Sequence, residues 1–174
     1  GGNDTLFGGS GNNKLYGGAG VDVLMASSGQ DLLDGGTESD TVVYKNSTAG
    51  VEIHFGGAAS WTGSGGWAEG DTLRNVNNYT GSEHDDVIVW AGNNGGDQNT
   101  LLGLGGNDTL STGDGIDRID GGAGNDTIEG GKNDDLLMGG TGNDTFVFNA
   151  TDWGVNTLAD MAHDFLHLVR IPVH

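Results

Sequence analysis

Apolar residues recur at every ninth position over two long stretches of the chain. Around each of them the sequence repeats a nine-residue unit: glycines come first, an acidic residue stands sixth and the apolar residue stands eighth. Units in phase cover residues 1–43 and 94–147, and one isolated copy covers residues 81–89. The eighth positions of these twelve copies are Leu6, Leu15, Leu24, Leu33, Val42, Ile88, Leu101, Leu110, Ile119, Ile128, Leu137 and Phe146. A fixed period of this kind predicts a repeat architecture with one inward-facing side chain per unit.

Each unit is too short to be stable alone. Its first six residues predict a turn and its last three predict a strand, and a strand of about three residues needs neighbours. Two units make one coil of 18 residues with a turn at each side, and stacked coils pair their strands in parallel. The period therefore predicts an all-β parallel solenoid.

The glycine at position four indicates a backbone conformation that other residues rarely adopt. Eight of the twelve copies have glycine there, and the exceptions are Glu38, His84, Asp97 and Asn133. Glu38 and His84 fit worst, so we expect the repeat geometry to decay beside the interruption between the arrays.

The sixth positions predict a metal site. Ten of the twelve are Asp, and stacking at 18 residues places Asp22 over Asp4 and Asp126 over Asp108. Like charges about 4.8 Å apart on neighbouring strands destabilise the stack, and a hard dication between them reverses this effect. Calcium suits such a site because it takes six to eight oxygen ligands, including the backbone carbonyls that glycine-rich turns leave free.

Composition supports an oxygen-ligand metal protein and excludes several other classes. The chain has 174 residues, no cysteine, and a formal net charge of −19 from 25 acidic and 6 basic residues. The sequence has no stripe of basic residues that could bind nucleic acid, and no apolar run reaches the roughly 18 residues of a membrane span. The lack of cysteine excludes disulfides, thiolate metal sites and a cysteine nucleophile. The high negative charge itself calls for bound cations.

These units resemble the GGxGxDxUx repeat of the RTX (hemolysin-type) calcium-binding proteins, as in Gly121-Gly122-Ala123-Gly124-Asn125-Asp126-Thr127-Ile128-Glu129. The resemblance implies a parallel β-roll, a calcium-loaded right-handed solenoid. It also implies that each ion is held by carbonyls of positions two and four and the Asp of one turn. Carbonyls of positions one and three and the Asp of the turn 18 residues on complete the site. The implied ligands are Asp4, Asn13, Gly18, Gly20, Asp22, Asp31, Gly35, Thr37, Asp40, Asp86, Asn99, Leu104, Gly106, Asp108, Gly113, Gly115, Asp117, Gly121, Gly122, Ala123, Gly124, Asp126, Gly130, Lys132, Asp135, Gly139, Thr141 and Asp144.

The spacing also predicts the number of ions. Three pairs of turns 18 residues apart occur in the first array and four in the second, which gives about seven Ca²⁺ ions. Their fourteen positive charges would reduce the net charge from −19 to about −5, which a folded domain tolerates. Asn13 and Asn99 replace the charged ligand, so their pairs are expected to be weaker.

Between the arrays, residues 44–80 lose the repeat but keep strand-like alternation. We interpret them as degenerate coils of one solenoid, with residues 56–66 forming an outward loop; the alternative is a flexible linker between two separate rolls. The four extra residues Trp90-Ala91-Gly92-Asn93 should bulge outward and restore the phase. The organisation predicted is thus a first array (1–43), degenerate coils (44–80), a second array (81–147) and a C-terminal cap (148–174).

The cap segment has helical periodicity at Leu158, Met161, Ala162 and Phe165, which predicts a short amphipathic helix. Within it, His163 and His167 have the i, i+4 spacing of a zinc-binding HExxH motif. The Glu of that motif is absent and no third ligand follows, so we favour solvent-facing histidines.

The function that the sequence favours is a non-catalytic calcium-binding β-roll. The resemblance implies a secreted, extracellular protein that leaves the cell through type I secretion machinery and folds in external calcium. It also implies a larger protein, since the chain starts in mid-repeat. One alternative is an alginate-type carbohydrate-binding module, with Trp61 and Trp67 stacking on a polysaccharide. A third class, an enzyme within residues 44–80, has only Glu52, His54, Glu69 and Asp71 as acid or base groups.

Overall fold

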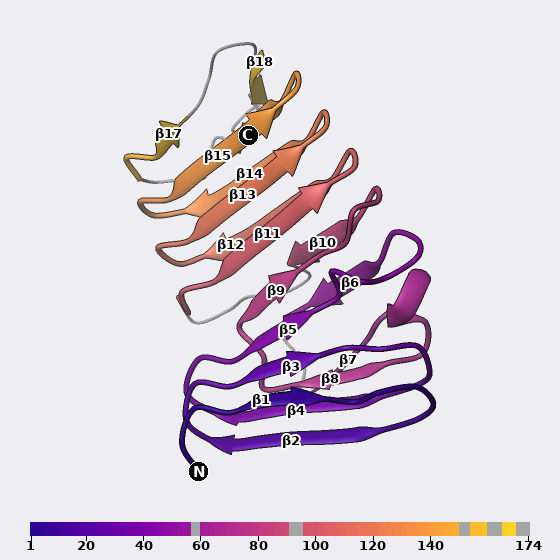
Figure 1. Cartoon of the computed structure of the whole chain (residues 1–174). Coiled ribbons are helices and arrows are strands. Elements are labelled where there is room, and N and C mark those ends of the chain that lie inside the picture. The colour runs from indigo at the N-terminus through magenta and orange to yellow at the C-terminus, as the bar shows by residue number, and fades with distance from the viewer. Residues whose placement is uncertain (57–59, 91–95, 150–153, 160–164, 170–174) are drawn as a thin grey trace.

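The chain forms a solenoid in which short strands are stacked one above the other from the N-terminal to the C-terminal end (Figure 1). The computed structural model describes residues 1–56, 60–90, 96–149, 154–159 and 165–169, the last without side chains. These residues form about eight turns of a parallel β-roll, and their one helical segment is the 3₁₀ turn η1 (Gly66–Ala68). Among them no helix is long and apolar enough to cross a membrane.

One side of the solenoid is a single eight-stranded sheet. Every pairing in it is parallel, as expected of stacked coils. Its strands, in spatial order, are β1 (Thr5–Phe7), β3 (Val23–Met25), β5 (Thr41–Val43), β9 (Asn78–Thr80), β11 (Thr100–Gly105), β13 (Arg118–Ala123), β15 (Leu136–Thr141) and β17 (Thr157–Ala159). Because this sheet passes from the first array through β9 into the second, the middle section is part of one solenoid and not a linker.

The other side is divided into two sheets. The first contains β2 (Lys14–Ala19), β4 (Leu32–Thr37), β8 (Thr72–Arg74) and β7 (Trp61–Thr62). The second contains β18 (Phe165–Val169), β16 (Thr145–Asn149), β14 (Thr127–Lys132), β12 (Thr109–Asp114), β10 (Val87–Trp90) and β6 (Glu52–Phe55). The interruption in the repeat therefore breaks this side alone.

The strand register confirms the predicted 18-residue coil. Leu6 pairs with Leu24 and Ile119 pairs with Leu137, both 18 residues apart. The spacing changes around the interruption: it is 40 residues between Leu33 and Leu73, and 22 between Ile88 and Leu110. The eighth positions form the core: all are buried except Leu6, which is half-buried at the N-terminal end of the stack. Many strands reach six residues, longer than expected, because pairing resumes at positions two and three of the next unit.

The middle section supplies its own core residues. Ile53, Leu73 and Tyr79 take the place of eighth-position residues and are fully buried. The expected outward loop is wrong in part, because β7 pairs antiparallel with β8 and Trp61 packs against the core. Trp90 also does not bulge outward, since it lies in β10 with its ring against Phe55; residues 57–59 and 91–93 lie outside the described residues. Aromatic bulk thus replaces the regular repeat here.

The helix expected after the second array is wrong. Leu158 lies in β17, paired with Leu137, and Phe165 begins β18, which pairs with β16. The edges of β15 and β16 offer unpaired backbone groups, and parallel pairing satisfies them as a helix could not. Met161, Ala162 and His163 lie outside the described residues, as does the side chain of His167. The structure therefore does not test whether His163 and His167 face solvent or bind zinc.

Candidate metal sites

The sixth-position side chains form a ladder along each side of the solenoid. The long ladder follows the eight-stranded sheet. At each step except that between Asn77 and Asn99, the backbone N–H of one member donates a hydrogen bond to the Oδ1 of the next member. Asp22 donates to Asp40 over 2.7 Å and Asp117 donates to Asp135 over 3.0 Å. Its members are Asp4, Asp22, Asp40, Asn77, Asn99, Asp117, Asp135 and Asn156.

A second, broken ladder follows the two shorter sheets. One part consists of Asn13, Asp31 and Asp71, and the other of Asp86, Asp108, Asp126 and Asp144. The same N–H to Oδ1 bonds, of 2.7–2.8 Å, connect the members within each part. Spacing alone did not predict the Asp31–Asp71 or Asp86–Asp108 steps, because these partners are 40 and 22 residues apart.

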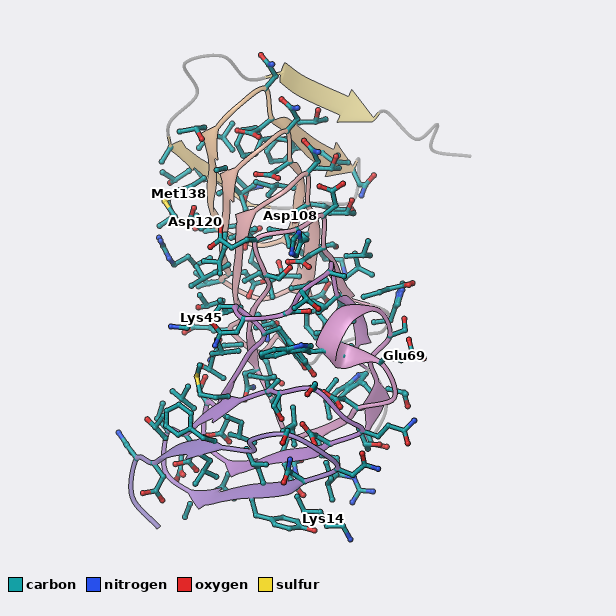
Figure 2. All side chains as sticks on the ribbon, turned by 45° about the vertical axis from the view of Figure 1, so that its right-hand side comes forward. Lys14, Lys45, Glu69, Asp108, Asp120 and Met138 are labelled. Carbon is teal, nitrogen blue, oxygen red and sulfur yellow. The ribbon has the colours of Figure 1, made fainter. Side chains whose placement is uncertain are left out.

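The second oxygen of several carboxylates has no protein partner. The Oδ2 atoms of Asp22, Asp40, Asp108 and Asp126 are buried and accept no hydrogen bond from the described residues. These four residues are at most 1% exposed, and Figure 2 places Asp108 within the stack, whereas Lys14 and Glu69 project from its surface. A buried carboxylate oxygen without a donor is costly, so these atoms indicate a cation.

Backbone carbonyls converge on the same places. A Cβ added to Gly103 would meet both Asp108 Oδ2 and the carbonyl of Gly121, and a Cβ on Gly17 would meet Asp22 Oδ2 and the carbonyl of Gly35. The strand register skips these first-position residues, so the space beside them lies between paired segments. A site of two carboxylates and several carbonyls fits calcium, which prefers many oxygen ligands at irregular geometry. No group of three or more His, Asp or Glu side chains that could hold a metal occurs in the described part of the chain, so carbonyls must complete each site.

Burial raises the pKa values of two carboxyl groups of the broken ladder, those of Asp108 and Asp126. The pKa of Asp108 rises to about 8 because burial outweighs the hydrogen bond from the Asp86 amide, and the charges of Asp86 and Asp126 raise it further. Burial likewise raises the pKa of Asp126 to about 6. The protein itself thus provides too little positive potential to compensate these charges.

The turns adopt the backbone conformation that the repeated glycines predict. Glu38 and Asn133 at position four have φ values of 75° and 80°, and Leu104 at position two has 82°. The expected decay at Glu38 is therefore wrong: its side chain accepts a hydrogen bond from the Gly20 amide and the turn is kept. His84, by contrast, does not adopt a positive φ.

The second oxygens of some carboxylates accept hydrogen bonds from hydroxyl groups instead. Ser27 Oγ donates to Asp31 Oδ2 over 3.1 Å, and Tyr44 Oη donates to Asp71 Oδ2 over 2.9 Å. Burial, followed by the charge of Asp71, raises the pKa of Tyr44 well above its usual value, so this hydroxyl keeps its proton. Sequence reasoning missed Asp71 as a ladder member, although Asp71-Thr72-Leu73 repeats the acidic–x–apolar signal of a unit.

The remaining candidate residues do not form a site together. Glu52 and His54 make an exposed pair of 2.8 Å, Glu69 accepts a hydrogen bond from the Gly65 amide, and Asp71 is buried in the broken ladder. Trp61 and Trp67 are packed against the core, so they do not form an exposed platform for sugar rings.

Comparison with protein-family models finds four copies of the RTX calcium-binding nonapeptide repeat, at residues 1–33, 11–42, 93–115 and 111–146, which together span more than half of the chain. No curated protein matches the chain.

Proposed function

Since the chain belongs to the RTX calcium-binding nonapeptide repeat family, we propose that its two ladders hold Ca²⁺ ions and that binding these ions drives folding of the roll. The observation that carries this proposal is the buried, unpartnered Oδ2 of Asp22, Asp40, Asp108 and Asp126 beside converging carbonyls. Calcium would supply the positive charge that these oxygens lack.

We assign about seven ions to the pairs of turns 18 residues apart. In the Asp108–Asp126 pair, carbonyls of Leu104 and Gly106 and those of Gly121 and Ala123 would complete the ligand set. The Ala123 carbonyl also accepts a hydrogen bond from the Gly106 amide, and its second lone pair is available to a cation. The same positions serve in the other pairs.

Folding is expected to depend on the ions because each unit buries little apolar surface. Without a cation, the stacked carboxylates repel each other and the ordering entropy of nine residues is not offset. A domain of this kind suits a non-catalytic role in a larger secreted protein: it stays unfolded in low cytosolic calcium, passes through type I secretion machinery, and folds in extracellular calcium.

Circular dichroism during a calcium titration tests the proposal. The metal-depleted protein should gain β-structure when millimolar calcium is added, and magnesium should not replace calcium because its strict octahedron fits carbonyl-rich turns poorly. Equal folding in magnesium would contradict the assignment.

A pair of variants tests the ladder itself. Asp126→Ala removes a buried ligand that two stacked pairs share, whereas Asp4→Ala removes a half-exposed one that belongs to a single pair. Asp126→Ala should therefore raise the calcium midpoint of folding more and lose more bound ions by equilibrium dialysis. Equal losses would count against the stacking assignment.

A further inference from the structure

One step of the broken ladder differs from the others in its hydrogen bonding. The Asp31 amide donates to Asp71 Oδ1 over 2.7 Å, the same bond that the Asp22 amide makes to Asp40 in the long ladder. Both steps bring together two buried Asp residues. By stacking alone, Asp31 and Asp71 should hold a cation as Asp22 and Asp40 are proposed to do.

Their second oxygens, however, already have donors. Asp71 Oδ2 accepts a hydrogen bond from Tyr44 Oη and Asp31 Oδ2 accepts one from Ser27 Oγ, whereas Asp22 and Asp40 receive no such bond. Tyr44 is fully buried, so its hydroxyl is fixed in the interior. Each carboxylate of this step therefore has a donor on both of its oxygens.

The turns around this step also differ from the calcium-type turns. Ser27 stands at position two and does not adopt a positive φ. Apart from Ser82, every other described position-two residue of the repeat does. On the Asp71 side the turn is the 3₁₀ segment η1, and the carbonyl of Ala68 accepts a hydrogen bond from the Asp71 amide. That carbonyl stands at the third position of the turn and is bonded within the turn itself, whereas the third-position carbonyl of Ala123 accepts its bond from Gly106 in the neighbouring coil.

We infer that the hydroxyl groups of Tyr44 and Ser27 take the place of a calcium ion between Asp31 and Asp71, so that this stacked pair binds no metal. The inference rests on the proposed calcium sites of the other pairs. Tyr44 then determines which stacked carboxylates bind calcium, and the centre of the solenoid has one step that closes without an ion.

Counting bound calcium in two isosteric variants of the whole chain tests the inference. Asp71→Asn should bind as many ions as the unmodified protein at saturating calcium, by equilibrium dialysis, because no ion is held there. Asp126→Asn, the matched control in the same ladder, should lose at least one. Loss of an ion in Asp71→Asn as well would overturn the inference and leave the proposed function standing. An unchanged count in Asp126→Asn would instead overturn the proposed calcium ladder, and this inference with it.

A second comparison covers the case in which Asp71→Asn does not fold. Tyr44→Phe removes the hydroxyl that contacts Asp71, while Tyr79→Phe removes that of an equally buried tyrosine, whose hydroxyl makes only a 3.4 Å bond to the Val76 carbonyl. Tyr44→Phe should move the calcium midpoint of folding to higher concentration, or add one bound ion, and Tyr79→Phe should do neither. Identical behaviour of the two variants would overturn the role of Tyr44.

Discussion

The coils of residues 100–147 and those of residues 44–90 belong to one solenoid but close their turns by different means. In the former, one fully buried apolar side chain per unit stands beside carboxylates such as Asp108 and Asp126, whose second oxygens have no protein donor. In the latter, Phe55 packs against Tyr79 and Trp90 with ring centroids 4.7 and 4.9 Å apart. The same backbone path thus has an aromatic core in one region and, under the proposed function, bound ions in the other.

The magnitudes of burial and ordering support the proposal that the repeats need bound ions to fold. Complete burial of one Leu or Ile contributes about 1.5–3 kcal/mol, whereas ordering nine backbone residues costs about 1–2 kcal/mol each. The middle section has the largest fully buried side chains of the described chain, including Tyr44, Tyr79 and Phe55, so more of its ordering cost is offset by burial.

Removing calcium should separate the two regions most clearly. In the presence of a chelator, we expect amides of residues 100–147 to exchange rapidly and those of β6, β9 and β10 to keep partial protection, because the latter are held by the aromatic core and by Tyr44. Hydrogen exchange with mass spectrometry measures this. Uniform loss of protection along the chain would show that the middle section depends on the ions as much as the repeats do.

Truncating one buried phenylalanine in each region is expected to have the next largest effect. Phe55→Ala and Phe146→Ala each create a core cavity that costs about 3–5 kcal/mol, and both residues are at most 1% exposed. In calcium the two variants should lose similar stability in denaturant unfolding. Without calcium, Phe55→Ala should still weaken the residual structure, whereas Phe146→Ala should have no further effect, since its array is already unfolded.

The pH dependence of the protein's stability should have opposite sign with and without calcium. The pKa values of about 6 for Asp126 and about 8 for Asp108 lie above the usual value of 3.8, so the folded state binds more protons than the unfolded chain. Their contribution to stability in the calcium-free protein is complete below about pH 4 and is lost as the pH rises through 6 and 8.

Circular dichroism of the metal-depleted protein should therefore show more β-structure at pH 5 than at pH 8.5. With calcium the order reverses, because the ion needs deprotonated ligands. A calcium-free protein that gains structure as the pH rises would contradict the buried, uncompensated state of these carboxylates.

The period alone predicted the fold and the ladders of the arrays because each unit repeats the same local choice of glycine, Asp and one apolar residue. It could not predict the middle section, where Tyr44 and Asp71 meet across 27 residues through tertiary packing. The helix predicted for the C-terminal segment was wrong for a related reason. Leu158 and Phe165 have helical spacing, but pairing with the open edges of β15 and β16 determines their conformation. Local sequence patterns determine the structure of the repeats. Tertiary packing and the open edges of neighbouring strands determine the structure of the segments that depart from the repeat.

The smallest effect is expected at a single turn of the second array. Asn133 at position four has a φ of 80°, a conformation that glycine adopts freely and asparagine only at a modest cost. Asn133→Gly should therefore stabilise the calcium-loaded protein, by less than about 1 kcal/mol in denaturant unfolding, and Asn133→Ala should not. The turns of the repeats need this conformation to aim their carbonyls, so the gain should disappear when calcium is removed.

A matched substitution in the adjacent unit controls for the loss of an asparagine. Asn125 does not have a positive φ, and its Oδ1 accepts a hydrogen bond of 2.9 Å from the Asn143 amide. Asn125→Gly should consequently destabilise the loaded protein by about 1 kcal/mol, the net value of one such bond. If both glycine variants shifted stability in the same direction, backbone strain at position four would not be the cause, and the repeated turns would owe their shape to the ion alone.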